Sequence, residues 1–354
     1  MNPRFKKNNF DLLRFLFAFT VFLVHTHVLS GQAALELFSV LLSPGLAVKS
    51  FFVVSGLLVF MSCETSDSTK AYFEKRVRRI YPAYFTVVAL CALLLVVVST
   101  TEAAHYYSAE WLRYLVVNLA FANFLQPTLP GVFEGHRFAE VNGALWTLKV
   151  EVMFYAVVPV LAWLFRRCGR LASLAVFAAG SLAYAAWMEA LAHSTGSGIY
   201  TILARQLPGQ LSYFLAGAFF YYYLDFFERH VGWFVAAAIA LFVLHRWYGF
   251  AAFEPLWLAT FVAFFGFFAY AGNFGRFGDF SYGIYILHFP IIQTLVYLGV
   301  FERSPWLGVA LSIALVLAAA VVLWKLVEKP FLRRSSHYVL ATRAAAPEPP
   351  SPHR

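Results

Sequence analysis

Ten apolar segments run through the sequence, most of them about as long as a helix that crosses a lipid bilayer. About 20 residues of α-helix span the hydrocarbon layer, and backbone polar groups there must be satisfied within the segment. The sequence therefore predicts an all-α, polytopic transmembrane bundle of about ten spans. The predicted spans are residues 10–30, 44–62, 80–99, 145–166, 171–191, 208–224, 231–248, 253–272, 279–300 and 305–327.

Composition supports the lipid bilayer as a partner and argues against other classes of partner. Hydrophobic residues make up 61% of the 354 residues and charged residues only 13%, against about 25% charged residues in soluble domains. The net charge of +9 does not indicate nucleic acid, because the basic residues lie between the apolar spans. Cys63, Cys91 and Cys168 form no CxxC pair, and no His/Cys spacing resembles a metal site, so no metal is expected.

The distribution of basic residues predicts the orientation in the membrane. With a cytoplasmic N-terminus, nineteen of the 27 Lys and Arg residues fall on the cytoplasmic side and five on the other. This asymmetry follows the positive-inside rule, so both termini are predicted to be cytoplasmic. Residues 1–334 are expected to form one membrane domain and residues 335–354 a disordered tail. The long non-cytoplasmic loop at 100–144 is expected to contain an interfacial or re-entrant helix at 111–124.

The first span carries two ionisable residues, Arg14 and His25. Eleven residues at about 100° each bring the two side chains to one helix face, roughly 16 Å apart along the axis. A charged group at bilayer depth costs a few kcal/mol, which favours a functional role. A neutral histidine there can act as general base for a sugar hydroxyl. In the structural alternative, Arg14 snorkels and pairs with Asp11, and His25 is a satisfied interior histidine.

Basic residues at 75–79 come just before the third span. Guanidinium groups bind phosphate oxygens at two points, so Arg76 and Arg79 are candidates for a phosphate clamp. Ordinary positive-inside charge is the alternative interpretation of this run. Glu151 lies one to two turns inside the fourth span and would face a cation, a sugar hydroxyl or His25. A structural role paired with a cation is an equal alternative for this glutamate.

A proline interrupts the ninth span two residues after a histidine. His288 lies two residues before Pro290, and proline removes a helical hydrogen bond and kinks the helix. The backbone groups that this frees are expected to line a cavity.

Together these segments resemble the acyltransferase-3 family of membrane acyltransferases, which includes bacterial O-antigen and exopolysaccharide O-acetylases. Five landmarks match in order over residues 8–332. They are Arg14 and His25 as Arg-x10-His, residues 51–56 as FFVISG, Arg76 and Arg79 as Arg-x-x-Arg, residues 146–151 as WSLSVE, and residues 281–290 as SYxLYLLHxP.

The resemblance implies an enzyme that moves an acyl group from cytoplasmic acyl-CoA to a hydroxyl of a cell-surface or lipid-linked saccharide. It implies that no cofactor is permanently bound, with acyl-CoA, by default acetyl-CoA, as co-substrate, and that the protein resides in the bacterial cytoplasmic (inner) membrane. His25 would be the general base or a transient acyl carrier, and Glu151 would orient it or bind the acceptor. The acyl-CoA-binding residues would be Arg14, Arg76 and Arg79, and the site-lining residues Ser55, Trp146, Tyr282 and His288.

The chain departs from the family pattern at two positions, and other functions remain open. Thr147 and Lys149 replace the usual serines, which bears on acceptor or acyl preference. Many relatives also carry a fused hydrolase-like domain, and without one this chain is expected to act alone. A transporter or flippase of lipid-linked oligosaccharide is the alternative, although no internal repeat is visible. A membrane scaffold is a weaker one, since it leaves the buried ionisable residues unexplained.

Overall fold

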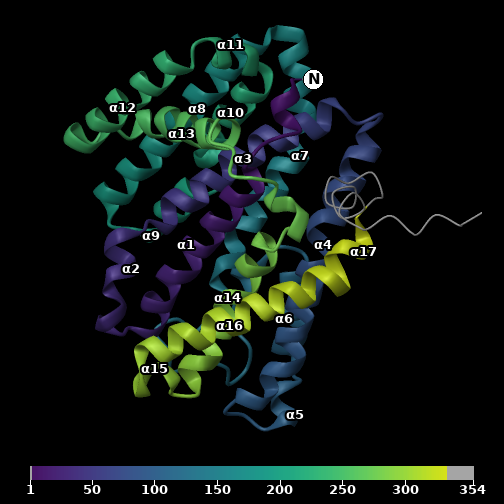
Figure 1. Cartoon of the computed structure of the whole chain (residues 1–354). Helices are drawn as coiled ribbons and strands as arrows, with labels where there is room; N and C mark the ends of the chain where they lie inside the picture. Colours follow the sequence, from purple (N-terminus) through teal and green to yellow (C-terminus); the bar gives the residue numbers. More distant parts are fainter. Residues whose placement is uncertain (1, 333–354) are drawn as a thin grey trace, which may run out of the picture.

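The computed structural model describes residues 2–332, and the regular structure in that range is helical (Figure 1). The longer helices are α1 (Phe10–Ser30), α3 (Pro44–Glu64), α4 (Thr69–Leu94), α7 (Trp146–Cys168), α8 (Arg170–Thr195), α10 (Leu207–Tyr222), α12 (Val231–Tyr248), α13 (Glu254–Phe267), α14 (Ser281–Tyr297) and α16 (Pro305–Leu323). The shorter ones are α2 (Glu36–Leu41), α5 (Ala103–Tyr106), α6 (Ala109–Leu119), α9 (Gly198–Ala204), α11 (Leu224–Arg229), α15 (Val300–Arg303) and α17 (Lys329–Phe331).

The predicted all-α membrane architecture is confirmed, and a helix occupies each of the ten predicted spans. Seven helical segments in the described range are long and apolar enough to cross a membrane. The other three helices, α10, α13 and α14, have 16, 14 and 17 residues. The helix expected in the long loop is present as α6. The tail predicted for residues 335–354 lies outside the described residues.

Helix α4 begins at Thr69, eleven residues before the predicted start of the third span at residue 80. The side chain of Ser68 accepts a hydrogen bond from the backbone N–H of Ala71 at 3.1 Å, and this cap starts the helix in its polar part. The basic run is therefore helical rather than a loop. Residues three apart on a helix lie on the same face, so Arg76 and Arg79 project together.

Glycines bring α3 and α10 into direct backbone contact. A Cβ atom on Gly56 of α3 would lie 1.9 Å from the carbonyl oxygen of Phe214, and one on Gly217 of α10 would lie 1.9 Å from that of Val53. Small residues permit this close approach of helices in membranes. The contact fixes the position of α3, which lies beside both α1 and α7.

The segment before α7 is hydrogen-bonded to α14 at a backbone group that Pro290 leaves free. Pro290 has no N–H, so the carbonyl oxygen of Ile286 loses its helical donor. Asn142 supplies a replacement, because its Nδ2 donates to that oxygen at 2.8 Å. The freed carbonyl thus binds a loop side chain instead of lining a cavity, contrary to the prediction from sequence. One turn further, Gln293 donates to the carbonyl oxygen of Phe138 at 2.6 Å.

The segment before α1 is fixed to α11 and to the end of α13. Arg4 Nε donates to Glu228 Oε1 at 2.7 Å, and the guanidinium lies 4.0 Å from the ring centroid of Phe268. Hydrogen bonds from Arg4 and Asn2 lower the pKa of Glu228, so the carboxylate stays ionised at neutral pH. The ion pair holds the N-terminal segment beside the site described below.

Candidate functional site

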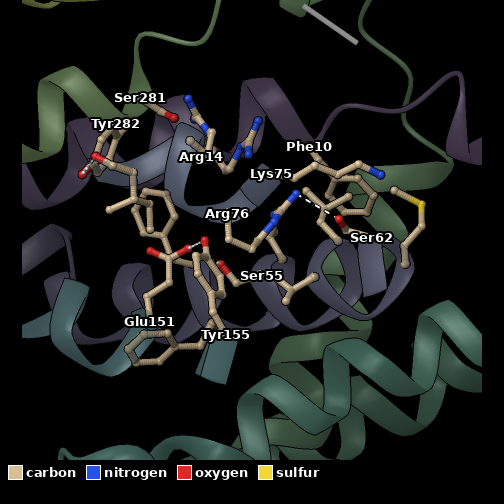
Figure 2. Close-up of a pocket in the computed structure, with 18 of the residues that line it drawn as sticks. Phe10, Arg14, Ser55, Ser62, Lys75, Arg76, Glu151, Tyr155, Ser281 and Tyr282 are labelled. Carbon is tan, nitrogen blue, oxygen red and sulfur yellow. Dashed lines mark hydrogen bonds between the residues drawn. The ribbon is translucent and has the colours of Figure 1, made fainter. Parts of the chain in front are cut away.

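A cavity of about 450 Å³ lies among α1, α3, α4, α7 and α14 (Figure 2). Six of the nine residues that the sequence predicted for the site line it, and three of the nine do not. The six are Arg14, Ser55, Arg76, Arg79, Glu151 and Tyr282, and the three are His25, Trp146 and His288.

The cavity runs from a basic opening to an aromatic inner wall. Arg78, near the start of α4, has 43% of its side chain exposed, whereas Arg79 has 16%. Tyr285, which lines the cavity from α14, is only 6% exposed. Its ring packs edge-on against Phe51 of α3, with the centroids 5.7 Å apart. A negatively charged ligand would therefore meet cations first and the Tyr285 wall last.

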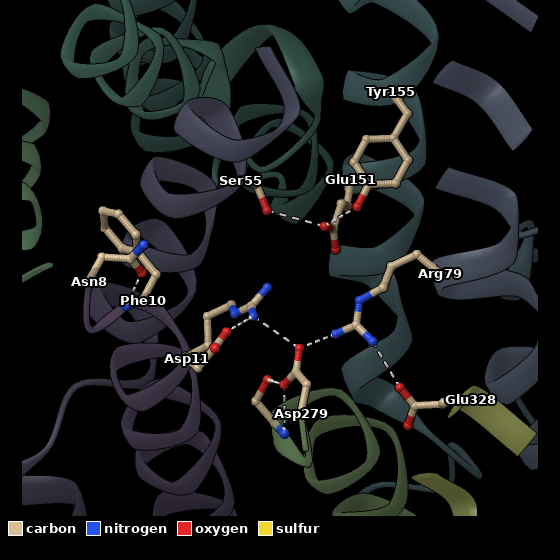
Figure 3. Close-up of polar contacts among 11 residues, drawn as sticks. Asn8, Phe10, Asp11, Ser55, Arg79, Glu151, Tyr155, Asp279 and Glu328 are labelled. Carbon is tan, nitrogen blue, oxygen red and sulfur yellow. Dashed lines mark hydrogen bonds and ion pairs between the residues drawn. The ribbon is translucent and has the colours of Figure 1, made fainter. Parts of the chain in front are cut away.

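Two of the arginines are held by buried carboxylates that the sequence analysis missed (Figure 3). Arg14 pairs with Asp11, as the structural alternative from sequence expected, and its Nη2 also lies 3.0 Å from Oδ2 of Asp279. Arg79 forms an ion pair with the same Asp279 oxygen. The other terminal nitrogen of Arg79 donates to Glu328 at 3.0 Å. Both carboxylates have side chains only 1% exposed. Guanidinium groups that are largely removed from water require such partners, and the position of Asp279 and Glu328 at predicted span ends was a usable signal.

Arg76 differs from these two arginines in its partners. Its Nη2 donates to Ser62 Oγ at 3.1 Å, and the guanidinium lies 5.7 Å from the ring centroid of Tyr155. Its Nε is buried and has no hydrogen-bond partner among residues 2–332. No ion pair joins Arg76 to a carboxylate in that range. Arg76 therefore keeps its charge and a donor for an anionic ligand.

Glu151 forms the polar centre of the cavity wall made by α3 and α7 (Figure 3). Its Oε1 accepts hydrogen bonds from Ser55 Oγ at 3.1 Å and from the Tyr155 hydroxyl at 2.6 Å. Of the three partners considered from sequence, His25 is not bonded to Glu151 among the described contacts. The glutamate faces the space in which a ligand of the cavity would lie.

His25 and His288 form a hydrogen-bonded pair behind the Tyr285 wall. The His25 Nδ1 and His288 Nε2 atoms are 2.7 Å apart, and the ring planes are nearly parallel at 14°. His288 is fully buried, its ring centroid lies 5.8 Å from that of Tyr285, and His25 keeps some exposed surface. Arg14 thus contacts Asp279 and His25 contacts His288, so both side chains face the same segment of the chain. This agrees with their predicted position on one face of the helix.

The remaining predicted residues support the cavity. Trp146 begins α7 and packs against the core, and the Tyr282 hydroxyl donates to the carbonyl oxygen of Ile80 at 3.0 Å. Thr147, one of the two departures from the family pattern, lies 2.8 Å from the Tyr285 hydroxyl. This threonine holds the inner wall in place. Within the described range no group of three or more His, Cys, Asp or Glu could hold a metal ion.

Comparisons with known proteins identify the family to which the chain belongs. A family model described as an acyltransferase domain matches residues 7–325. The chain is 29% identical to an O-acetyl transferase of Shigella phage Sf6, over 94% of this chain and 98% of that protein. It is 28% identical to nodulation protein 10 of Rhizobium leguminosarum bv. viciae, over 92% and 94% of the two chains. No solved structure matches the chain. With a family match over nearly its whole length, the chain belongs to the acyltransferase-3 family of membrane acyltransferases.

Proposed function

We propose that this protein transfers an acyl group, by default acetyl, from cytoplasmic acyl-CoA to a hydroxyl of a cell-surface or lipid-linked saccharide. The observation that carries the proposal is the cavity, which has basic residues at its opening and an imidazole pair directly behind its inner wall. The O-acetyl transferase among the relatives supports acetyl as the acyl group. The positive-inside rule supports a cytoplasmic opening, and the resemblance to bacterial O-acetylases implies the inner membrane of a bacterium.

The anionic end of the donor would bind at the cavity opening. Arg76 is the principal candidate for the phosphates, because Arg14 and Arg79 already form ion pairs with Asp279. Lys75 adds positive charge at the same opening, whereas Arg78 lines it but pairs with Glu74 at 3.0 Å. Residues 14 and 25 are roughly 16 Å apart along α1, a distance of the order of an extended pantetheine arm. The thioester would then pass Glu151 and meet His25 once the Tyr285 side chain, which separates the cavity from the imidazole pair, moves aside.

His25 would be the general base of the reaction. Its imidazole takes the proton of the acceptor hydroxyl while the hydroxyl oxygen attacks the thioester carbonyl carbon. The carbon–sulfur bond breaks, and the CoA thiolate takes the proton from the imidazolium. The products are the saccharide ester and free CoA. In the transient-carrier alternative, the imidazole itself attacks the thioester and holds the acyl group before transfer.

The proposal is tested with purified protein and radiolabelled acetyl-CoA, comparing wild type with His25→Ala and Arg76→Gln. Label leaving CoA in wild type, with strong loss in both variants, supports the transferase, and label retained on wild-type protein identifies the acyl carrier route. Arg166→Gln is the matched control, since Arg166 is a basic residue outside the cavity lining and pairs with Glu64 at 3.2 Å. If the wild-type protein neither binds nor consumes acetyl-CoA, and instead moves lipid-linked oligosaccharide in proteoliposomes, the protein is a transporter.

A further inference from the structure

The hydrogen bonds of the imidazole pair determine which nitrogen of each ring carries the proton. His288 Nδ1 lies 3.2 Å from the backbone carbonyl oxygen of Ile284. A carbonyl oxygen can only accept, so His288 Nδ1 is the donor. In a neutral imidazole the other nitrogen is then an acceptor, and His288 Nε2 faces His25 Nδ1 at 2.7 Å. His25 Nδ1 must therefore carry a proton, which leaves the lone pair of His25 on Nε2.

The surroundings of the pair keep His288 in this neutral form. It is fully buried, and the rings of Phe22, Tyr285 and Phe289 lie with their centroids 5.8 to 6.4 Å from its own. Among residues 2–332 no carboxylate forms a hydrogen bond or ion pair with either imidazole. The charged form of His288 thus has no counter-ion in the described structure, and a buried charge without one is costly.

Exposure separates the roles of the two histidines. His288 has no solvent-accessible surface, whereas His25 retains some. With Nδ1 of His25 occupied by His288, the nitrogen left to meet a ligand is Nε2. Phe289 packs edge-on against the His25 ring, with the centroids 5.7 Å apart, and limits its rotation. The pair has one member that can touch a substrate and one that cannot.

We propose that His288 is a positioning residue that fixes the tautomer and ring orientation of His25, so that Nε2 is the reacting nitrogen. This inference rests on the proposed function. When Nε2 takes the proton of the acceptor hydroxyl, the new imidazolium still donates from Nδ1 to His288 Nε2, and that hydrogen bond strengthens with the charge. In serine hydrolases an aspartate fixes the tautomer and orientation of the catalytic histidine in this way. A neutral histidine performs it without adding a carboxylate to the membrane interior.

The test compares His288→Gln with His288→Phe. The side-chain oxygen of glutamine can reach the position of His288 Nε2 and accept from His25, while phenylalanine keeps a ring without an acceptor. We expect His288→Phe to lower kcat by about 100-fold or more without changing KM for acetyl-CoA. The kcat of His288→Gln should be at least about tenfold higher than that of His288→Phe. Equal kcat in wild type and His288→Phe, or no recovery with glutamine in a folded protein, overturns the proposal.

A measurement on the wild-type protein keeps the proposal testable if these variants do not fold. Protein with ¹⁵N-labelled histidine is examined by solid-state NMR in bilayers at neutral pH, with His25→Ala used to assign the His25 signal. The expected result is a protonated Nδ1 and an unprotonated Nε2 on His25, and the opposite tautomer overturns the inference. The tautomer does not depend on turnover. An inactive wild type with the expected tautomer thus counts against the proposed function, and an active wild type with the opposite tautomer counts against His288.

Discussion

Arg14 on α1 and Arg79 on α4 meet at one carboxylate oxygen, Oδ2 of Asp279. This shared contact joins three segments that are far apart in the sequence. In Asp279→Asn the two half-buried guanidinium groups lose their common counter-ion, while Arg14 keeps Asp11 and Arg79 keeps Glu328. Breaking a buried ion pair by removal of one partner costs about 3–5 kcal/mol, so we expect a clear fall in the melting temperature of the detergent-solubilised protein.

A surface ion pair provides the control for this prediction. Arg166 has 51% of its side chain exposed and pairs with Glu64, and pairs of this kind contribute at most about 1 kcal/mol. Arg166→Gln should therefore shift the melting temperature much less than Asp279→Asn. Equal shifts in the two variants would show that the Asp279 ion pairs matter no more to the fold than the exposed Arg166 does.

Replacement of Arg76 should affect donor binding more than stability. Its hydrogen bond to Ser62 is lost in Arg76→Gln, but no carboxylate in the described range is left without its cation. A hydrogen bond between charged groups contributes about 1.5–3 kcal/mol, so we expect KM for acetyl-CoA to rise about tenfold to a hundredfold. Steady-state kinetics at two salt concentrations measure this, and Arg76→Lys should retain part of the affinity. An unchanged KM would remove Arg76 from the donor site.

The contact between Asn142 and Ile286 can be isolated with a double-mutant cycle. Asn142→Ala leaves the Ile286 carbonyl oxygen without its donor, at a cost of about 1–3 kcal/mol. Pro290→Ala restores the backbone N–H that the helix lacks there. Loss of Asn142 should therefore cost less in the Pro290→Ala background than in wild type. Equal costs, measured by thermal unfolding, would mean that the side chain stabilises the loop in some other way.

The backbone contact between α3 and α10 predicts a strict size limit at Gly56. Alanine there places a methyl carbon 1.9 Å from the Phe214 carbonyl oxygen, and overpacking of this kind costs about 1–3 kcal/mol. Gly180→Ala on α8 is the matched control, because its Cβ meets no described atom within 4 Å. We expect a lower folded yield and a lower melting temperature for Gly56→Ala, and no such change for Gly180→Ala. Similar values for both variants would show that the helices separate at little cost.

Hydropathy and helix periodicity predicted much of this architecture from the sequence. The apolar spans and the shared face of Arg14 and His25 are local properties, which follow from residue spacing along one helix. The partner of each buried charge is not local. Asp279 and Glu328 become partners of Arg79 only when three separate segments pack together. The early start of α4 was missed for a different reason, since its first turns are helical but polar and hydropathy does not detect them.

The ion pairs of Arg14 and Arg79 with carboxylates also affect how the donor site would release its product. A donor site built only from unpaired cations would bind free CoA as tightly as acyl-CoA, because both carry the same phosphates. Such a site would be inhibited by its own product, because free CoA would occupy it as readily as the donor does. With Arg14 and Arg79 neutralised by Asp279 and Glu328, fewer cations hold the spent donor. In the proposed reaction, this balance of charge favours release of CoA before the next cycle.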